Sequence, residues 1–499
     1  MPDTLSLISN VFGEHMVFQS NASVFVWGFS PANSIVDVSF RGVNNASTVA
    51  TADGTWRVEL SAEDAGGPFT LSVVSSASSL SSITYTDVYV GTVLICSGQS
   101  NLSGDTTPVS YAFNASDTIA ESSSFPLVRV FKVGELGTPG DSLLLPQLAF
   151  PPKIPWSVAE PASVTDFSAT CWLTAKVLAR ELGSEHAIGL IESAWSGTCM
   201  QAWLPADALA TCGPPPPAQP AMNTNSTLFN QIINPFGGFA IAGIVWYQGE
   251  SNAIFDDDVN YYACALPAWI LSWRAFFRNK NAWLGIVQLA PWSGNADATQ
   301  NAMTATTRDV QLAVAAANDY SITVATAVDL GDEDAPMRSI HPRPKQELGR
   351  RLAAGALFHL FGIGALTDIG GPVYASAVAG GGSAGVLSAV VTFRPPFDAP
   401  GALSLSSVAP WPGLPAASDC PSDVSSFLCA GFQLLDLNGT WWPASGALSA
   451  DAQTLVLIAS TAPQGSVLRA TASGWSLWPL ISLYGATGGL PAYPWQHNV

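Results

Sequence analysis

Both ends of the chain alternate short apolar and polar runs, and Gly, Asn and Ser separate the runs. The clearest runs are 22–28, 36–40 and 55–60 near the N-terminus, and 386–393, 454–458 and 466–470 toward the C-terminus. Successive side chains of a strand point to opposite faces of a sheet, so this pattern is typical of antiparallel sheets with one buried face. We therefore expect a β-rich region over residues 1–88 and a region like a β-sandwich over 367–499.

The middle of the chain, residues 89–366, has a different pattern, in which short apolar runs alternate with longer stretches of helical periodicity. The expected core strands are 93–96, 187–191, 241–246, 283–288 and 321–328. The expected helices are 166–182, 257–277, 303–317 and 344–361. Strands that alternate with helices in this way predict an α/β domain with a parallel sheet built from βαβ units.

Ligands of an open α/β sheet bind beyond the carboxyl ends of its strands, so the residues that follow each strand are the candidates for chemistry. These stretches are 97–101, 193–198, 247–252 and 329–334, with a later loop at 339–343. Together they supply a hydroxyl, a small glycine turn, an amide with a carboxylate, and an acidic loop that leads to a histidine. Nucleophilic acyl transfer needs these parts: a serine, a base for its proton, and donors for the oxyanion.

Ser100 and His341 are the strongest pair for this chemistry. His341 alone among the five histidines falls in a loop after a core strand. A competing serine, Ser383, stands in a G-x-S-x-G pattern at 381–385, but a nucleophile elbow needs a strand before it and a helix after it. The flanks of Ser383 read as two strands, so we interpret it as the tip of a hairpin.

Charge and motif content exclude several classes of function. The chain has 37 acidic and 18 basic residues, a formal net charge of −19. Nucleic acids and anionic membrane surfaces repel such a protein, so neither is an expected partner. No apolar run reaches the ~18 residues that span a bilayer. There is no P-loop, Rossmann fingerprint or H-E-x-x-H motif, and we expect neither cofactor nor metal.

The seven cysteines form no C-x-x-C pair and have no histidine at zinc-ligand spacing, which argues against a structural zinc site. Cys420 and Cys429 are spaced to close a short disulfide loop in an oxidising compartment. It is equally consistent with the sequence that the cysteines are buried in the apolar interior as thiols. The odd total leaves at least one free thiol.

The strand-end stretches form an ordered set of motifs. They read CSGQSN at 96–101, WSGT at 195–198, WYQGESNA at 246–253, DLGD at 329–332 and IHPR at 340–343. In this order they closely resemble the sialate O-acetylesterase family of SGNH hydrolases, and the similarity covers essentially the whole chain, more loosely after about residue 370. The resemblance implies a three-layer α/β/α hydrolase domain with β-rich accessory regions, and an esterase without metal or cofactor.

The resemblance also implies roles for individual residues. By position in the family motifs, Ser100 is the nucleophile and His341 is the general base. The N–H groups of Ser100 and Gly197 form the oxyanion hole together with a side-chain amide. Gln248 is favoured for that amide, and Asn252 is the alternative.

One position departs from the pattern of many SGNH enzymes, which place an aspartate three residues before the histidine. That position is Arg338 here. We favour Asp334 as the acid that orients His341. Asp332, Glu250 or a backbone carbonyl in a Ser–His dyad remain alternatives.

Glu250, Arg308 and Trp246 are the expected substrate-binding residues. Arg308 or Arg343 is a candidate partner for a sialate carboxylate, and Trp246 a candidate to stack against a sugar face. The alternative for either arginine is a structural role on the surface or at the end of a helix. The alternative for Trp246 is a place in the core, since the chain has 17 tryptophans.

The resemblance implies hydrolysis of O-acetyl esters of sialic acids, of the 9-O-acetyl type, so the expected partner is an O-acetylated sugar. One alternative is a deacetylase of plant or algal polysaccharides, because the scaffold also resembles acetylxylan esterases. The other is a carbohydrate-binding protein with a silent hydrolase site, against which the retention of all the motif residues argues. The oligomeric state is not predicted.

Family resemblance and six Asn-x-Ser/Thr sequons favour a lysosomal or secreted glycoprotein. Residues 1–5 lack the basic start of a signal peptide, so either the sequence is truncated or the protein stays inside the cell. One sequon begins at Asn101, directly beside the expected nucleophile. A glycan there would block the site, so we expect Asn101 to be unmodified.

Overall fold

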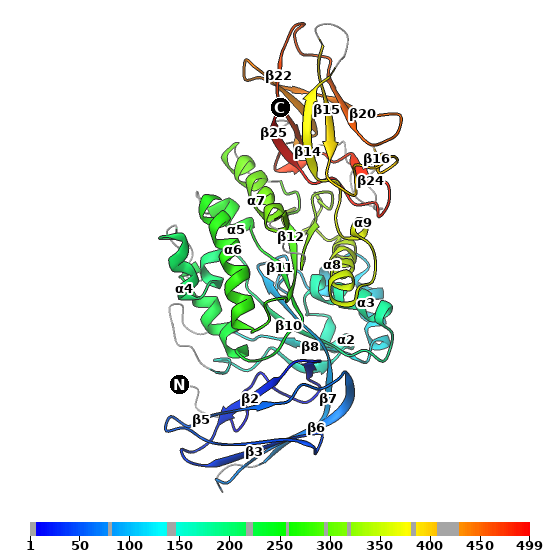
Figure 1. Ribbon diagram of the computed structural model, residues 1–499. Helices are drawn as coiled ribbons and strands as arrows, with labels where there is room; N and C mark the ends of the chain where they lie inside the picture. The colour runs from blue at the N-terminus through cyan, green and yellow to red at the C-terminus, as the bar shows by residue number, and fades with distance from the viewer. Residues whose placement is uncertain are drawn as a thin grey trace. The chain divides into compact units, whose positions relative to one another are not determined.

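The computed structural model describes most of the chain, and Figure 1 shows its elements. The described residues are 6–77, 82–136, 146–215, 223–255, 259–293, 298–316, 321–380, 386–406 and 429–499. The chain forms two compact units, Met1–Gly285 and Ile286–Val499.

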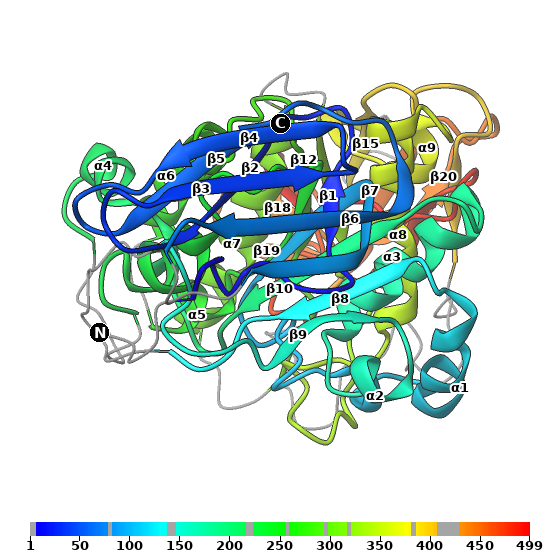
Figure 2. The same ribbon diagram turned by 90° about the horizontal axis from the view of Figure 1, so that it is seen from below.

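An antiparallel layer begins the first unit. Its strands are β1 (Val17–Gln19), β2 (Val24–Phe29), β3 (Ile35–Phe40), β4 (Asn44–Val49), β5 (Thr55–Leu60) and β6 (Gly66–Ser75). β3 lies between β4 and β6 and pairs with both (Figure 2), and β2 pairs with β5. Alternate residues of β3 and β5 are buried, as their alternating sequence predicts.

The long strand β7 (Ile83–Gly98) belongs to two layers. Its first part pairs with β6 and β1, and its second part pairs in parallel with β10 (Ile188–Ala194) and β11 (Gly243–Tyr247). The position between residues 88 and 89, where the sequence pattern changes, therefore falls inside one continuous strand. This continuity joins the N-terminal layer directly to the sheet that carries Ser100.

The central sheet of the first unit is mostly parallel. Its strand order is β11-β7-β10-β8-β9, where β8 is Val128–Lys132 and β9 is Ile154–Val158. β8 runs parallel to β10, and β9 is antiparallel to β8. The second half of β7, in the interior of this sheet, is buried throughout, which explains why its sequence is a continuous apolar run.

Helices cover this sheet, and Figure 1 shows α3 and α6 on its opposite faces. The helices of the unit are α1 (Ala115–Ala120), α2 (Pro161–Val164), α3 (Ala169–Leu182), α4 (Ala206–Leu209), α5 (Glu250–Phe255) and α6 (Val259–Phe276). The hydroxyl of Ser168 caps α3 by accepting a hydrogen bond from Cys171 N at 3.2 Å, and Gly183 follows its last turn. The expected α/β fold class is confirmed.

The second unit begins within β12 (Trp283–Gln288) and continues the alternation of strands and helices. It contains α7 (Ala298–Ala316), β13 (Ile322–Thr326), α8 (Lys345–Phe361) and α9 (Leu366–Ile369). Ala327 N, just after β13, donates to Gln288 O at 3.0 Å. Gly362, with a φ of 68°, ends α8 in the left-handed conformation that commonly closes a helix.

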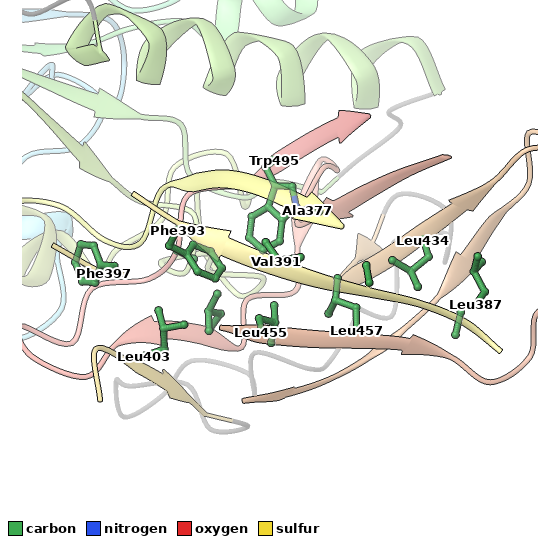
Figure 3. Packing of buried hydrophobic residues seen from close by; sticks show 14 residues of the cluster. Ala377, Leu387, Val391, Phe393, Phe397, Leu403, Leu434, Leu455, Leu457 and Trp495 are labelled. Carbon is green, nitrogen blue, oxygen red and sulfur yellow. The ribbon is translucent and has the colours of Figure 1, made fainter. Parts of the chain in front are cut away.

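The rest of the second unit is β-rich. One sheet has the order β14-β15-β21-β20 and the other the order β19-β18-β22-β25. The strands are β14 (Tyr374–Ala379), β15 (Leu387–Phe393), β18 (Phe432–Asp436), β19 (Trp441–Pro443), β20 (Ser445–Leu448), β21 (Leu455–Ala459), β22 (Leu468–Ser473) and β25 (Trp495–Asn498). Two short pairs add β16 (Leu403–Leu405) with β24 (Leu483–Gly485), and β17 (Cys429–Ala430) with β23 (Trp478–Pro479). Side chains from both sheets form one buried core, including Val391, Leu434, Leu457 and Trp495 (Figure 3).

The five strands and four helices expected in the middle of the chain are all present. Most ends differ by up to about five residues, but β7 begins ten residues before the strand expected at 93–96. The sequence did not predict β8, which lies between β10 and β9, or β9. Each is only five residues long, and β8 includes Arg129 and Lys132, which interrupt its apolar run. β14 and β15 pair as an antiparallel hairpin around Ser383, as expected, while residues 381–385 themselves lie outside the described residues. Within the described part of the chain, no helix has the length and apolar character that a bilayer crossing requires.

Two disulfides lie in the first unit, Cys96–Cys171 and Cys212–Cys264. Neither pairing was predicted, because residues 75 and 52 positions apart in the sequence meet only through the fold. The first links β7 to α3 and the second links the end of a short helical turn to α6. Cys199 is buried and forms no disulfide with any described residue. The expected Cys420–Cys429 loop lies outside the described residues, since Cys420 and the Cys429 side chain are not described.

We expect removal of the Cys212–Cys264 bridge to lower the free energy of unfolding. Replacing both cysteines by serine frees a long loop in the unfolded chain and should cost about 2–4 kcal/mol. The measurement is denaturant unfolding of both proteins without reductant. A peptide map without reduction should recover both linked pairs and an unlinked Cys199, and a linked Cys199 peptide would contradict the pairing.

Candidate active site

A tight turn at the end of β7 carries Ser100. Gly98 has a φ of 135°, and a Cβ on it would lie 2.1 Å from Tyr247 O, so this approach of two strands needs glycine. The next residue, Gln99, donates its N–H to the same carbonyl at 2.9 Å. The hydroxyl of Thr107 donates to Ser100 O at 2.9 Å. These bonds to the backbone fix the position of Ser100, which is 7% exposed.

The loops after β10 and β11 start at the same level as this turn. In the register of the sheet, Gly98 is opposite Ala194 on one side and Tyr247 on the other. Trp195 N donates to Gly98 O at 2.9 Å. Gly197 follows in this loop with a φ of 72°. The structure thus brings Ser100, Gly197 and the loop of Gln248 to one edge of the first unit.

The two candidate amides differ in what their atoms bind. Gln248 is fully buried, and its Nε2 donates to Thr198 O at 3.0 Å and to Asn252 Oδ1 at 2.7 Å. Both of its N–H bonds are therefore committed within the protein. Asn252 Oδ1 also accepts from Met200 N at 3.0 Å, which fixes the orientation of the Asn252 amide. These bonds disfavour Gln248 as the oxyanion donor, and the role of either amide stays a prediction.

Asn101 and Glu250 form a buried pair beside Ser100. Asn101 is fully buried, and its Nδ2 donates to Glu250 Oε1 at 2.7 Å. Glu250 is only 3% exposed. A glycan on Asn101 does not fit this position, which supports the expectation that its sequon is unmodified.

A buried carboxylate, Glu192 on β10, holds the segments on either side of the Ser100 turn. Its Oε1 accepts from Gly104 N and its Oε2 from Ser168 N, both at 2.7 Å. Lys132 Nζ lies 3.5 Å from Oε1 and also donates to Asp166 O at 2.8 Å. Burial raises the pKa of the Glu192 carboxyl, while the Lys132 charge and the two N–H groups lower it.

Trp246 is a core residue and not a platform for sugar. It is fully buried in β11, and its ring packs against three other tryptophans with centroid distances of 4.3–5.8 Å. These are Trp203, Trp269 and Trp273. The expected stacking of Trp246 on a substrate is corrected, because no face of the indole reaches the surface.

The loop after β13, in the second unit, carries His341 and the acidic residues. Two of its aspartates are bound to arginines of the same unit. Asp332 accepts from Arg343 Nε at 2.6 Å and Nη2 at 2.9 Å, and Asp329 pairs with the buried Arg351 at 2.7 Å. Arg343 is therefore engaged with Asp332, and these ion pairs fix the loop on which His341 stands.

His341 Nδ1 lies 2.7 Å from Met337 O, a backbone carbonyl four residues earlier. With the proton on Nδ1, Nε2 is the basic nitrogen. Asp334, the favoured orienting acid, is exposed, whereas the Met337 carbonyl that meets Nδ1 corresponds to the expected alternative of a backbone carbonyl. Burial lowers the pKa of His341, and the charges of Lys345 and Arg338 lower it further, against the hydrogen bond to Met337.

Arg308 has a structural role instead of the expected substrate contact. It is fully buried in α7, and its guanidinium donates to the backbone carbonyls of four residues of the second unit. These are Leu289, Ala290, Ser476 and Leu477. A guanidinium saturated in this way has no open edge for a sialate carboxylate.

Comparison with known proteins agrees with this geometry. A family model described as a carbohydrate esterase, sialic acid-specific acetylesterase, matches residues 90–357, more than half of the chain. The chain belongs to this family. The family implies a serine carboxylic-ester hydrolase with an acetylated carbohydrate as its substrate.

Individual relatives of this esterase also support its membership of the family. The sialate O-acetylesterases of Pongo abelii and Homo sapiens are each 30% identical over 376 residues, which cover 68% of this chain and 68% of theirs. A solved carbohydrate acetylesterase from Xanthomonas citri is 27% identical, covers 99% of both chains and has a TM-score of 0.79.

Glu192, Lys132 and Gln99 are structural supports of the esterase that the sequence did not reveal. Gln99 Oε1 accepts from Ser251 N at 3.2 Å and Gly249 N at 3.4 Å, which ties the first and third loops together. The one available signal was Glu192, a carboxylate inside an apolar strand. Among the described residues, no three acidic, cysteine or histidine side chains gather as a metal site.

We expect Glu192→Gln to lower both stability and turnover. The amide cannot accept hydrogen bonds at both termini, so the N–H of Gly104 or Ser168 loses its partner, at about 1–3 kcal/mol. Thermal unfolding and acetate release are the measurements, with exposed Glu181→Gln on α3 as the matched control. An unchanged Tm and kcat in the Glu192 variant would contradict the positioning role.

Proposed function

We propose that this protein removes O-acetyl groups of the 9-O-acetyl type from sialic acids, through an acetyl-enzyme on Ser100. The main support is the turn at the end of β7, which fixes Ser100 beside the loops of Gly197 and Asn252 within the family's motif order. Family membership supports the esterase chemistry, and the names of the relatives support the sugar.

In the proposed mechanism, Ser100 Oγ attacks the acetyl carbonyl carbon while His341 Nε2 accepts the hydroxyl proton. The tetrahedral intermediate collapses, the ester C–O bond breaks, and His341 returns the proton to the sugar oxygen that leaves. Water then attacks the acetyl-enzyme, with His341 again as base, and acetate departs. Met337 O, bonded to Nδ1, keeps the ring in the tautomer that this sequence needs.

The proposed oxyanion hole consists of Ser100 N–H, Gly197 N–H and Asn252 Nδ2. Gln248 acts on the amide of Asn252 and not on the substrate, since its Nε2 holds Asn252 Oδ1. Loss of one such donor typically costs about 10²–10³ in kcat.

A secreted or lysosomal location is part of the proposal. Its support is the pair of disulfides in the first unit, because disulfides form and persist in oxidising compartments.

We expect Ser100→Ala and His341→Ala each to reduce kcat by roughly 10³-fold or more on a 9-O-acetylated sialoside, since each removes a group that reacts. The measurement is acetate release, with acetylated xylan as the second substrate. Ser110→Ala, an exposed serine in the same segment, is the matched control and should keep full activity.

Each result decides between functions. The proposal is supported if the wild type hydrolyses the sialoside and both variants have lost this activity. Hydrolysis of xylan alone would favour the polysaccharide deacetylase. No acetate from either substrate, with a folded wild-type protein, would overturn the enzymatic assignment in favour of carbohydrate binding.

The pH profile of kcat/KM should report the lowered pKa of His341. The neutral imidazole is the active form, so activity rises as the proton leaves, with a midpoint below the ordinary histidine value of 6.5. Arg338→Gln removes a cation that favours the neutral ring and should move the midpoint upward. Arg469→Gln, on β22, should leave it in place, and a wild-type midpoint above 6.5 would contradict the assignment.

A further inference from the structure

A cavity of about 630 Å³ lies in the first unit, between the β2–β5 pair and the segments around residues 235 and 277. Six of its lining residues define what we call the arginine groove. They are Trp27, Thr51, Arg57, Asn234, Phe276 and Arg278. None of the residues proposed to act on the ester is among the described residues that line it.

The guanidinium groups of two residues that line this groove both lie against one aromatic ring, Phe25. Arg57 Cζ lies 4.1 Å from the centroid of Phe25, and Arg278 Cζ lies 4.8 Å from it. The two guanidinium carbons are thus at most about 9 Å apart, the sum that these distances allow. Arg57 is also directly opposite Trp27 across the β2–β5 pair.

The backbone of Gly238 supports the guanidinium of Arg57. A Cβ at this position would lie 2.4 Å from Arg57 Nη2 and 3.3 Å from Phe25 Cβ. Arg57 thus packs between a ring and a bare stretch of backbone, which limits the side chain to few conformations.

The two like charges lack the carboxylate partners that other cations of this unit have. Neither Arg57 nor Arg278 forms an ion pair with any described residue. Six other cations of the unit do, namely Arg41, Arg129, Lys132, Lys153, Lys176 and Arg180. The chain has about twice as many acidic as basic residues. Two neighbouring arginines without a carboxylate partner among the described residues are therefore unexpected.

Electrostatics within the protein agree with this description. Partial burial lowers the pKa of Arg57, and the neighbouring charge of Arg278 lowers it further, which Glu59 only partly offsets. A bound anion would relieve this repulsion. A guanidinium binds a carboxylate through two parallel hydrogen bonds, which makes arginine well suited to carboxylate recognition.

The other lining groups are those that bind sugars. Thr48 contributes a hydroxyl group, the hydroxyls of Thr51 and Thr55 bind each other and Asp53, and Phe276 and Pro235 offer apolar surface. Specific sugar sites combine an apolar wall with a few polar groups that fix the orientation of the ring. A simple inorganic anion would leave this wall unused.

We propose that the arginine groove binds the carboxylate of an acidic sugar, at a second carbohydrate site that does not include the ester-cleaving residues. Its role as an anchor for an acidic glycan rests on the proposed function, but binding itself does not require esterase activity. Sialic and uronic acids share the recognised group, and their relative affinities distinguish the two sources.

The test is calorimetric titration of N-acetylneuraminic acid and of glucuronic acid into the full chain and into an Arg57→Gln/Arg278→Gln variant. We expect the double variant to bind at least one of these acids at least tenfold more weakly at this site. Its kcat/KM toward 4-nitrophenyl acetate should be unchanged, because the ester-cleaving residues are intact. The tighter of the two acids identifies the sugar class.

Matched controls separate this site from a general effect of charge. Arg41→Gln/Arg180→Gln removes two partly exposed arginines that already pair with carboxylates in the same unit, and it should bind as wild type does. The methyl ester of N-acetylneuraminic acid, which lacks the negative charge, should not bind in the groove. Equal isotherms for the wild type and the Arg57/Arg278 variant, or equal binding of acid and ester, would overturn the proposal.

The esterase assays remain independent of this result. If Ser100→Ala abolishes acetate release while the Arg57/Arg278 variant binds acids as wild type does, the second site is refuted and the esterase stands. If the acids bind through the groove but no acetate is released by the wild type, the second site stands and the esterase is refuted. As a second variant, Gly238→Ala should displace Arg57 and weaken binding with both arginines still present.

Discussion

Gly98 lies so close to Tyr247 O that any side chain at this position would collide with the neighbouring strand. This contact ends β7 and turns the chain so that Gln99 bonds the same carbonyl and Ser100 stands at the carboxyl edge of the sheet. The loop after β10 bonds the Gly98 carbonyl in turn. Ser100, the proposed nucleophile, and the start of the loop after β10 are therefore positioned by backbone hydrogen bonds at one strand end, and β7 continues from this end into the N-terminal layer.

Buried charges stabilise the loops around the chemistry in both units. In the first, Glu192 binds two backbone N–H groups near Lys132, and in the second, Arg351 lies between Asp329 and Glu347. Such groups are expensive to bury and are tolerated when every partner is in place. Their contribution is mainly to specify one loop conformation, because an alternative arrangement would leave a charge unpaired. Precise loops are what an oxyanion hole requires.

The side chains expected to bind substrate illustrate where sequence reasoning fails. Arg308 and Trp246 occur in regions of the family motifs, yet both are fully buried and serve the interior. Asp334 is the favoured orienting acid in the sequence, but in the structure His341 Nδ1 meets the carbonyl of Met337. A residue type states what a side chain can do, whereas its exposure and its partners depend on segments that are distant in the sequence.

The sequence by itself determined the α/β fold class, the five strands and four helices of the middle region, the family, and the order of strand-end motifs that contains Ser100 and His341. Periodicity and turn residues are local, so they can be read without the fold. Only the tertiary structure decided the disulfide pairs, the strands β8 and β9, and the hydrogen bond from Gln248 to Asn252. Each of these depends on contacts between residues far apart in the chain, and burial and hydrogen-bond geometry exist only once those contacts form.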